Sequence, residues 1–449
     1  MKVCKFGGSS VASAAQIKKI CDIVIADSQR RIVVVSAPGK RHKDDVKVTD
    51  LLISCAEACI DGLPPDEPLQ QVIERFDSIG HELELPQEIA HEIRENITAT
   101  VMGSTEHAGR YMDAVKAAGE DNCARLVAGE LRRRGINAGY LNPGSAGLLL
   151  SDEYGNARLL PESGEKLAQL RDAEGIIVFP GFFGYTPDGE VVTFSRGGSD
   201  ITGSILAAAV GAEVYENFTD VDSVLAADPG IVPNAAPVPE ITFREMRELS
   251  YAGFGVLHDE AIIPAVRSGI PICIKNTNAP ELPGTMIVPE HVQVASRVVG
   301  TACSKGFCTV YVRKYLMNRE IGFGRRLLQI FEEEGISFEH SPSGIDDMSV
   351  IIREADLPPE AEQALMDKIR ERLQADNVSV ERGLALLMIV GEGMRQEIGL
   401  AAKITSALAE ARVNIEMINQ GSSEISMMFG IKEDDSNRAI ISLHKALFE

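Results

Sequence analysis

A lysine and two glycines mark the point near the N-terminus where a short apolar strand is followed by a helix. Lys5 precedes Gly7, Gly8 and Ser9, and the segment that we expect to be helical runs from about Ser10 to Ala26. Glycines let backbone amides approach an anion closely, and a helix N-terminus adds partial positive charge. The pattern is typical of a phosphate cradle, although an ordinary strand–helix turn with a surface lysine explains it equally well.

A second segment, residues 194–200, combines an arginine, glycines and an aspartate ahead of another predicted helix. Arg196 can form a bidentate pair with a carboxylate or a phosphate. Gly197 and Gly198 repeat the glycine-rich helix start, whereas Asp200 has a competing interpretation as a helix N-terminal cap. Because loops at the carboxyl ends of parallel strands meet at one edge of a sheet, the two segments together favour phosphoryl chemistry.

A third segment places hydroxyl and acidic groups directly after a predicted strand. Thr219 and Asp220 follow the strand expected over residues 212–218. They are candidates for holding the nucleoside of a nucleotide or a water bound to Mg²⁺. Turn chemistry alone also explains such a pattern, so this segment by itself does not discriminate.

Alternating strand and helix patterns position these segments. Residues 31–37 contain an unbroken apolar run that is typical of a strand buried on both faces. Further strands are predicted at 2–6, 136–141, 175–180, 191–194, 212–218 and 271–275, with helices between several of them. This alternation predicts a mostly parallel sheet covered by helices on both sides. We interpret the polar, helix-rich stretch from Pro64 to Gly109 as an insertion packed outside the sheet.

The pattern changes after about residue 299, where a β-α-β-β-α order occurs twice with a period of about 75 residues. The first copy includes a predicted strand over residues 336–340, and the second includes one over 413–418. The second copy lacks a final strand. Small repeated modules of this kind bind a regulator or mediate dimerisation more often than they catalyse, although a repeat kept only for packing is the alternative.

Composition excludes several classes of protein. The 449 residues include 44 basic and 66 acidic side chains, which gives a net charge of −22. Such a chain has no electrostatic reason to bind nucleic acid or an anionic membrane, and any phosphate that it binds requires local positive charge. Trp is absent and aromatic residues make up 5%, which argues against stacking platforms for bases.

The eight cysteines form no Cys-x-x-Cys pair. Cys55 and Cys59 lie in an apolar helical stretch, where thiols at this spacing are usually part of the core. The N-terminus lacks the features of a signal peptide, and no run of about 18 apolar residues follows. We therefore expect a reduced, soluble, cytoplasmic protein.

Taken in order, the motifs resemble those of the aspartokinases, within the amino acid kinase superfamily. The matching stretches are 5–11, 34–40, 119–120, 179–182, 196–200, 218–222 and 256–258. The resemblance implies an α/β fold in which helices sandwich a mostly parallel sheet, followed by two α+β ferredoxin-like ACT modules. It implies a catalytic domain over 1–298 with the helical insertion at about 64–109, a first ACT domain over 299–382 and a second over 383–449.

The resemblance also implies a reaction, the transfer of the ATP γ-phosphoryl group to the β-carboxylate of L-aspartate. This reaction is the first step towards lysine, threonine and methionine. A carboxylate is already ionised at neutral pH, so the protein needs no general base and acts by positioning and charge neutralisation. Mg²⁺ is expected to enter with ATP, without a metal site built from protein side chains alone.

Roles for individual residues follow from the resemblance. Lys5 would stabilise the transferred phosphoryl group, and Asp200 would orient Lys5. The expected ATP-binding residues are Lys5, Gly7, Gly8, Ser9, Thr219 and Asp220. On the aspartate side, Arg196 would pair with the α-carboxylate and Glu120 with the α-ammonium group. Ser36 and Thr49 would lie near the reacting carboxylate, although Thr49 also has a plain interpretation as a helix cap.

The ACT modules imply feedback inhibition by an end-product amino acid. The expected effector-binding residues are Met317, Phe323, Ser337 and Glu339. Nearby acidic groups favour lysine, and threonine remains open. Pairing of ACT modules implies a homo-oligomer, a dimer or larger.

Two positions depart from the family pattern, because Gly255 and Gly230 stand where relatives often carry a basic or polar residue.

The alternative functions are those of another member of the superfamily, acting on glutamate, acetylglutamate, carbamate or UMP, and of a catalytically weak or inactive amino-acid sensor. Glu120 and the paired ACT modules argue against the first, and Lys5, Arg196 and Asp200 against the second. An ACT-bearing dehydrogenase is disfavoured because no Gly-x-Gly-x-x-Gly follows a strand.

Overall fold

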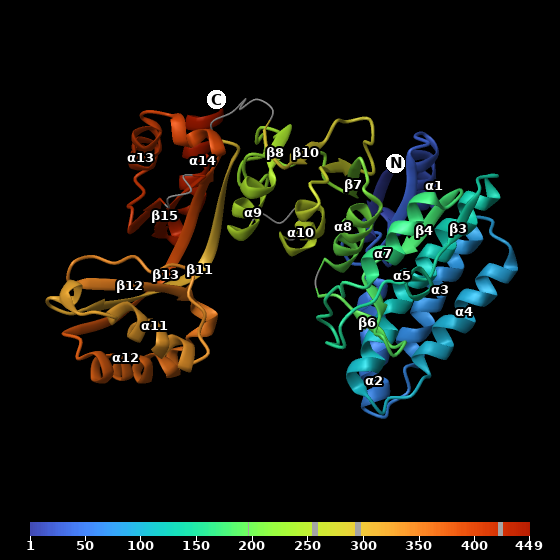
Figure 1. Ribbon diagram of the computed structural model, residues 1–449, viewed down its shortest axis with the longest axis horizontal. Coiled ribbons are helices and arrows are strands. Elements are labelled where there is room, and N and C mark those ends of the chain that lie inside the picture. The colour runs from blue at the N-terminus through green and yellow to red at the C-terminus, as the bar shows by residue number, and fades with distance from the viewer. Residues whose placement is uncertain (196, 254–258, 292–297, 421–424) are drawn as a thin grey trace. The chain divides into compact units, whose positions relative to one another are not determined.

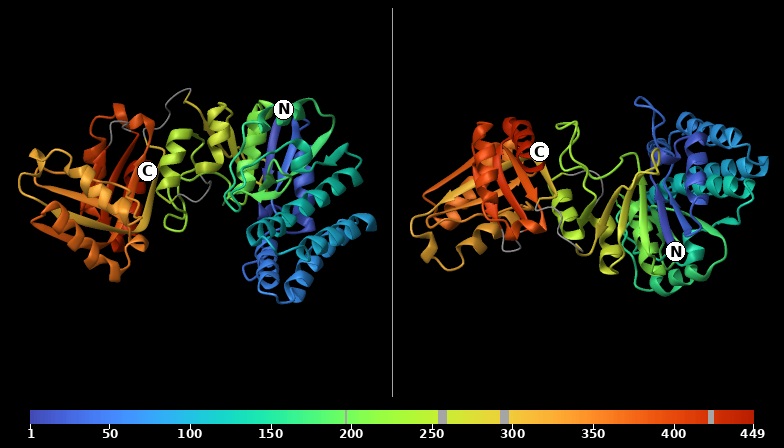
Figure 2. Two further views of the ribbon diagram at one scale, coloured as in Figure 1. Left: turned by 60° about the horizontal axis from the view of Figure 1, so that its bottom comes forward. Right: turned by 90° about the horizontal axis from the view of Figure 1, so that it is seen from above.

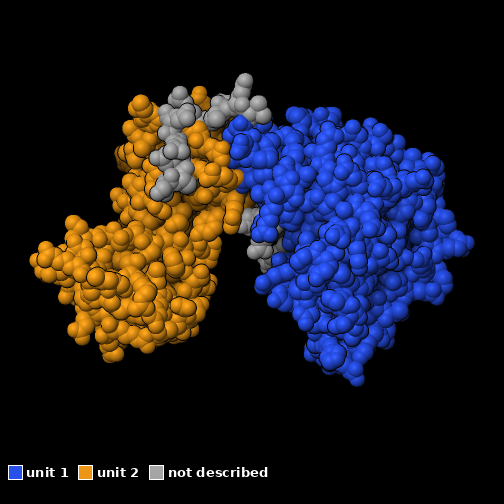
Figure 3. Space-filling view, viewed as in Figure 1, with its two compact units in different colours: residues 1–224, 237–243, 256–291 blue, residues 225–236, 244–255, 292–449 orange. Residues whose placement is uncertain are grey.

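The chain folds into two compact units. The computed structural model describes residues 1–195, 197–253, 259–291, 298–420 and 425–449. Unit 1 comprises residues 1–224, 237–243 and 256–291, and unit 2 comprises residues 225–236, 244–255 and 292–449 (Figure 3). Within the described ranges, no helix has the length and apolar character needed to span a bilayer.

Unit 1 is built on an eight-stranded sheet with the order β3-β4-β2-β1-β7-β9-β10-β8 (Figure 1). The strands are β1 (Lys2–Phe6), β2 (Arg30–Val35), β3 (Ala138–Tyr140), β4 (Ile176–Pro180), β7 (Val214–Thr219), β8 (Glu240–Thr242), β9 (Ile272–Asn276) and β10 (Thr285–Val288). All neighbouring pairs are parallel except β9 and β10. The mostly parallel sheet predicted from the alternating pattern is therefore confirmed.

Helices surround this sheet, and a small hairpin of β5 (Phe183–Tyr185) and β6 (Val191–Thr193) stands apart from it. The helices are α1 (Ala14–Ile25), α2 (Val48–Ile60), α3 (Asp66–Glu82), α4 (Gln87–Val101), α5 (Ala108–Arg133), α6 (Pro143–Ala146), α7 (Ser163–Ala168), α8 (Gly198–Val210) and α10 (Asp259–Arg267). The first predicted helix begins later than expected, because residues 8–11 form a 3₁₀ turn and Ser13 caps α1 by accepting the Gln16 N–H.

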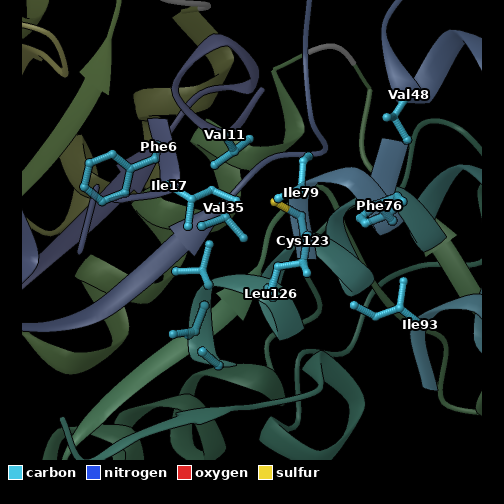
Figure 4. Packing of buried hydrophobic residues seen from close by; sticks show 14 of the residues in the cluster. Phe6, Val11, Ile17, Val35, Val48, Phe76, Ile79, Ile93, Cys123 and Leu126 are labelled. Carbon is cyan, nitrogen blue, oxygen red and sulfur yellow. The ribbon is translucent and has the colours of Figure 1, made fainter. Parts of the chain in front are cut away.

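The core of unit 1 lies between the sheet and α5. Figure 4 shows Phe6 and Val35, from β1 and β2, in one cluster with Cys123 and Leu126 from α5. Cys55 is fully buried in this cluster and Cys59 packs against it partly buried, in line with the core position expected for both, and all eight cysteines are free thiols. The segment 64–109 folds mainly into α3 and α4, which pack on α2 and α5 rather than on the sheet (Figure 1 and Figure 2).

Unit 2 has one five-stranded antiparallel sheet with the order β12-β11-β13-β15-β14. Its strands are β11 (Gly300–Arg313), β12 (Asp347–Arg353), β13 (Asn377–Val390), β14 (Met417–Gln420) and β15 (Ser426–Lys432), and its helices are α9 (Phe243–Tyr251), α11 (Phe323–Glu333), α12 (Pro359–Leu373), α13 (Leu400–Glu410) and α14 (Ser436–Phe448). Of these, only Phe243, the first residue of α9, belongs to unit 1.

The two repeats share their long strands. β13 runs continuously through two strands that the sequence pattern separates, at 377–381 and 384–390. The first residues of β11 pair with the C-terminal end of β13, from Gly300 opposite Val390 to Ser304 opposite Leu386. The strand that the second repeat lacks in sequence order is thus supplied by residues 300–304 at the start of β11, a segment that the bounds 299–382 assign to the first repeat.

Two predicted strands of the repeats differ from the structure. Residues 336–340 form no strand, because the Ile336 N–H turns back to the Phe331 carbonyl at the end of α11. Only His340 makes an isolated bridge, to Ile351. The strand predicted at 413–418 is displaced, since β14 begins at Met417.

Candidate active site

Lys5 meets two side chains from other elements at the carboxyl edge of the unit 1 sheet. Its Nζ lies 2.6 Å from Oδ1 of Asp200 and 3.5 Å from Oδ1 of Asn217. The Asn217 amide donates to the same Asp200 oxygen at 2.8 Å. The three groups close a triangle in which one cation, one anion and one amide satisfy one another, and Lys5 is only 7% exposed.

Sheet register and a helix start produce this triangle. Lys5 and Asn217 are direct partners in the pairing of β1 with β7, and the neighbouring Phe6 and Phe218 rings stack at 4.7 Å. Asp200 is the third residue of α8, whose N-cap position is held by Gly197 without a side-chain bond. The Asp200 carboxylate is therefore engaged with Lys5 and Asn217, and the capping interpretation is not needed.

The glycine loop after β1 touches the loop after β2. The Gly39 N–H donates to the Gly8 carbonyl at 2.9 Å, and a Cβ at Gly39 would lie 2.7 Å from the Gly8 carbonyl carbon. Only glycine permits this approach without moving the backbone. The two loops form one wall at the carboxyl ends of neighbouring strands.

A cavity of about 510 Å³ opens beside this wall. It is lined by six residues that the sequence assigned to substrates, namely Gly8, Ser9, Ser36, Thr49, Glu120 and Asp220. It is also lined by four basic side chains that the sequence interpretation did not assign, namely Lys40, His42, Lys43 and Lys47. A cavity that combines hydroxyls, a buried carboxylate and basic groups suits small anionic and zwitterionic ligands.

Glu120 is the buried carboxylate of this cavity. Its side chain reaches the cavity because Gly119 lets α5 approach the loop after β2, where a Cβ would lie 2.8 Å from that of Ala37. Oε2 of Glu120 has no hydrogen-bond partner among the described residues. Burial raises the pKa of Glu120 to about 8, although a backbone hydrogen bond at Ala37 opposes the shift. An unpaired acidic group facing a cavity is prepared to receive a cationic partner.

The other residues singled out from the sequence make local contacts or lie outside the described ranges. Thr49 is the second residue of α2, whose N-cap is Lys47, so Thr49 does not cap the helix. The Thr219 hydroxyl donates to Asp220 at 3.2 Å. The Gly230 N–H donates to the Asp228 carboxylate at 2.8 Å in a tight turn. Arg196 and Gly255 lie outside the described residues.

The donor set fits a metal that arrives with its ligand. Among the described residues, no three His, Cys, Asp or Glu side chains cluster as a metal site. Mg²⁺ usually keeps several waters and needs only one or two carboxylates together with substrate phosphates. The exposed Asp220 carboxylate lines the cavity and meets that requirement.

The four candidate effector-binding residues differ in burial and in their partners. Met317 and Phe323 are buried in the hydrophobic core of the first repeat, whereas Ser337 is exposed. Glu339 pairs with Arg353 at 3.2 Å and accepts a hydrogen bond from Tyr251. A separate cavity of about 610 Å³ on unit 2 is lined by other residues, including Tyr311, Ser349, Ser379 and Lys432.

Asn217 is the residue of the triangle that sequence analysis missed. It lies in β7, where a buried strand of mostly apolar residues includes the polar pair Glu216 and Asn217. Glu216 forms a bidentate pair with Arg30 at 2.6 and 3.0 Å. A polar residue within a strand buried on both faces was the available signal, because such a group requires a partner.

Comparison with known proteins agrees with this geometry. Residues 1–276 match the amino acid kinase family, and residues 387–447 match an ACT domain. The chain is 53% identical to aspartokinase 3 of Bacillus subtilis over 448 residues, covering 100% of this chain and 99% of that protein. It is 28% identical to the lysine-sensitive aspartokinase 3 of Escherichia coli over 464 residues, again covering 100% and 99%.

Solved structures agree as well. The Clostridium acetobutylicum aspartate kinase matches with a TM-score of 0.88 at 38% identity, and E. coli aspartokinase III in complex with aspartate and ADP matches with 0.77 at 27%, each over 100% of both chains. Fold and site thus define a kinase of the amino acid kinase family with C-terminal ACT domains. Within that class, the chain belongs to the aspartokinase family.

Proposed function

We propose that this chain transfers the γ-phosphoryl group of Mg-ATP to the β-carboxylate of L-aspartate, forming 4-phospho-L-aspartate. The observation that supports this proposal most directly is the triangle of Lys5, Asp200 and Asn217 beside a cavity that contains the buried Glu120. Lys5 offers a fixed positive charge where negative charge passes between the substrates. The acceptor carboxylate is already ionised, so the residues have to position and neutralise rather than remove a proton.

The amino acid would bind through opposite charges. Glu120 receives the α-ammonium group, Arg196 receives the α-carboxylate, and Ser36 and Thr49 flank the reacting carboxylate. Gly8 and Ser9 donate to phosphate oxygens, and Gly7 permits the close approach of the backbone while its own N–H donates to the Phe218 carbonyl at 3.2 Å. Thr219 and Asp220 lie at the nucleoside. Mg²⁺ enters with ATP and offsets the charge of the phosphates.

The reaction is tested by incubating the protein with Mg-ATP and L-aspartate in the presence of hydroxylamine, which traps the acyl phosphate as a hydroxamate. We expect aspartyl hydroxamate and little product from glutamate. Absence of hydroxamate would contradict the proposed reaction and favour the amino-acid sensor. Equal product from glutamate would remove the specificity for aspartate.

Regulation by an end-product amino acid is the second part of the proposal. An E. coli aspartokinase III that matches over the whole chain, with a TM-score of 0.76, was solved in complex with lysine and aspartate. Lysine is therefore the first effector to test here, followed by threonine, and inhibition would operate by a shift between conformations of different affinity. Activity curves that stay flat with both amino acids would refute this regulation.

We further propose that the functional protein is a homo-oligomer that pairs through the ACT modules, with the catalytic domain over 1–298 and the modules over 299–382 and 383–449. Light scattering coupled to size-exclusion chromatography measures the assembly. A monomer at every concentration tested would contradict pairing.

A further inference from the structure

Residues 39–47 form a segment, called here the basic loop, that contributes four positively charged or titratable side chains to the cavity. Lys40, His42, Lys43 and Lys47 all line it. This concentration is notable in a chain with a net charge of −22. Local positive charge decides whether an anion can enter a protein whose overall field repels it.

The basic loop is held in place from the helical insertion. Arg75 of α3 is 6% exposed and donates to the Gly39 carbonyl at 3.1 Å, to Oδ1 of Asp45 at 2.7 Å and to the Val46 carbonyl at 3.3 Å. The Arg41 N–H donates to Asp45 at 2.9 Å. Arg75 contacts both ends of the loop and so fixes the path of its backbone. This arrangement is maintained because separating Arg75 from Asp45 would leave a buried charge without a partner, which is costly.

Hydrogen bonds also keep the aspartate of this anchor ionised. Bonds from Arg41, with smaller help from the nearby Arg75, hold the pKa of Asp45 well below its usual range, against the effect of burial. The anchor therefore stays charged throughout the range in which an enzyme works. The lysines are exposed and free of this anchor, so their ammonium groups remain available to a ligand.

The position of the basic loop selects its ligand. It begins at Gly39, which contacts the Gly8 backbone directly. The lysines therefore lie in the chain just after the residue that contacts the glycine loop, which would bind the phosphates. Their side chains line the cavity on that side. Lysine binds phosphate as a point charge and needs no fixed fork geometry, which suits mobile side chains on a surface loop.

We propose that Lys40, Lys43 and Lys47 bind the phosphate groups of Mg-ATP, and that Arg75 is the positioning residue that holds the basic loop against the glycine loop. This inference rests on the proposed function and adds a set of nucleotide contacts to it. It also assigns a role to the helical insertion: α3 serves the substrate site at a distance, through one arginine.

The lysines are tested by titrating Mg²⁺ and the non-hydrolysable analogue AMP-PNP into the full-length protein without aspartate. The variants are Lys40→Gln, Lys43→Gln, Lys47→Gln and the triple variant. Lys166→Gln, at an exposed lysine of α7, is the control that matches the charge change of each single variant. Loss of one charge-assisted contact should weaken binding about tenfold. The triple variant should also depend less on salt, because fewer ion pairs are screened. The control should bind as the wild type does.

Two outcomes would overturn the assignment. If the triple variant binds AMP-PNP as tightly as the wild type, the lysines belong to the solvated surface. If AMP-PNP binding is unchanged and the KM for aspartate, measured separately by hydroxamate formation, rises instead, the basic loop serves the other substrate. Binding of AMP-PNP requires no turnover, so a wild-type protein that binds it yet forms no hydroxamate would refute the proposed reaction and leave the contacts intact.

Arg75 is tested separately with Arg75→Lys and Arg75→Met. A lysine cannot reach three acceptors as a guanidinium does, so both variants should raise the KM for Mg-ATP and flatten its salt dependence while kcat changes little. The melting temperature is measured alongside. A fall in melting temperature and kcat together, with KM and its salt dependence unchanged, would show that Arg75 is only structural.

Discussion

Lys5 is held from two elements at once, since Asp200 comes from α8 and Asn217 from β7. A lysine on a flexible four-carbon stem would otherwise sample many positions. Asn217 fixes the Asp200 carboxylate as well, through the amide that donates to it at 2.8 Å. The geometry of the ion pair between Lys5 and Asp200 therefore depends on the neutral side chain of Asn217, which contacts both.

Substitution Asn217→Leu keeps a side chain of similar size and removes both polar contacts. We expect kcat to fall about tenfold or more, since misplacing a catalytic charge by about 1 Å costs up to about 100-fold. The KM for aspartate should change little, because Asn217 does not line the cavity with Glu120. Hydroxamate formation measures both constants, and circular dichroism checks folding. An unchanged kcat in a folded variant would show that Asn217 does not position Lys5 and Asp200 for the reaction.

Glu120 predicts a pH dependence of aspartate binding. Because burial raises the pKa of Glu120 to about 8, the empty site holds a protonated carboxyl below that pH. The ammonium group of aspartate needs the ionised form, so affinity should fall about tenfold for each pH unit from 8 to 6 and level off above 8. Binding at pH 7 should release a proton, measured by calorimetry in buffers of different ionisation enthalpy.

The variant Glu120→Gln is the matched control, because it keeps size and polarity but cannot titrate. It should bind aspartate weakly and with no pH dependence between 6 and 8. The same slope in this variant as in the wild type would place the titrating group elsewhere.

The sequence made some of these residues recognisable and concealed others. Lys5 and Asp200 each lie two residues from a glycine that precedes or begins a helical segment, so short-range pattern identifies them. Asn217 is concealed because its role arises from strand register, which pairs it with Lys5 across more than two hundred residues of chain. The lysines of the basic loop look like an ordinary charged surface turn until Arg75 anchors that turn beside the cavity.

At the scale of elements, α5 organises the site. It is buried over most of its length and carries Glu120 towards the cavity. Two turns earlier, Asp113 is 1% exposed and its Oδ2 accepts the N–H groups of Gly155 at 2.7 Å and Thr193 at 2.8 Å. Thr193 ends β6, and the next segment leads into α8. One carboxylate thus ties the hairpin to the helix that carries Glu120.

Substitution Asp113→Ala should leave two N–H groups without partners, the buried one of Thr193 and the partly buried one of Gly155. Each such loss costs about 1–3 kcal/mol, so the free energy of unfolding should fall by about 2–6 kcal/mol. Asp113→Asn retains an oxygen that can accept both bonds and should lose much less. Urea denaturation compares the two variants. Equal losses in both would mean that the negative charge of Asp113, rather than its acceptor oxygen, stabilises the hairpin.

Elements were predictable where the pattern was local. The apolar run of β2 and the strand–helix alternation identified the parallel sheet, whereas the strand expected at 336–340 failed because Ile336 closes a helix. β13 also differs from the prediction: the turn-like Arg382 and Gly383 interrupt the pattern, yet the strand continues through them. β11 pairs with β13 on both sides of this interruption, at Glu381 and at Leu384, which makes that continuity favourable.

At the scale of the whole molecule, the chain crosses between the two units more than once. It leaves unit 1 after Val224, contributes residues 225–236 to unit 2 and returns to unit 1. Within unit 2, Ala227 is fully buried in one hydrophobic cluster with Leu387 and Phe429 of the second repeat. Only four residues separate Asp220, at the proposed nucleoside position, from this inserted segment.

That connection predicts how regulation reaches the kinase. The inserted segment is held by polar contacts, since the Thr301 N–H donates to the Ala226 carbonyl at 2.7 Å and the Ala236 N–H donates to Nε2 of His444 at 3.2 Å. A change in the packing of the second repeat must act on this segment, and through the chain on the strand end that it follows. The coupling free energy between effector and nucleotide should therefore depend on these contacts.

Substitution His444→Phe removes the acceptor for Ala236 and keeps an aromatic ring beside Phe448, which His444 contacts at 5.3 Å between ring centres. We expect the concentration of effector for half-inhibition to rise about fivefold or more, because typical couplings of 1–3 kcal/mol depend on few contacts. The kcat without effector should stay near the wild-type value, since His444 belongs to unit 2 and the triangle of Lys5, Asp200 and Asn217 to unit 1. Inhibition curves for wild type and variant at fixed aspartate measure the shift. A loss of kcat with unchanged half-inhibition would show that residues 225–236 support the kinase alone and carry no regulatory signal.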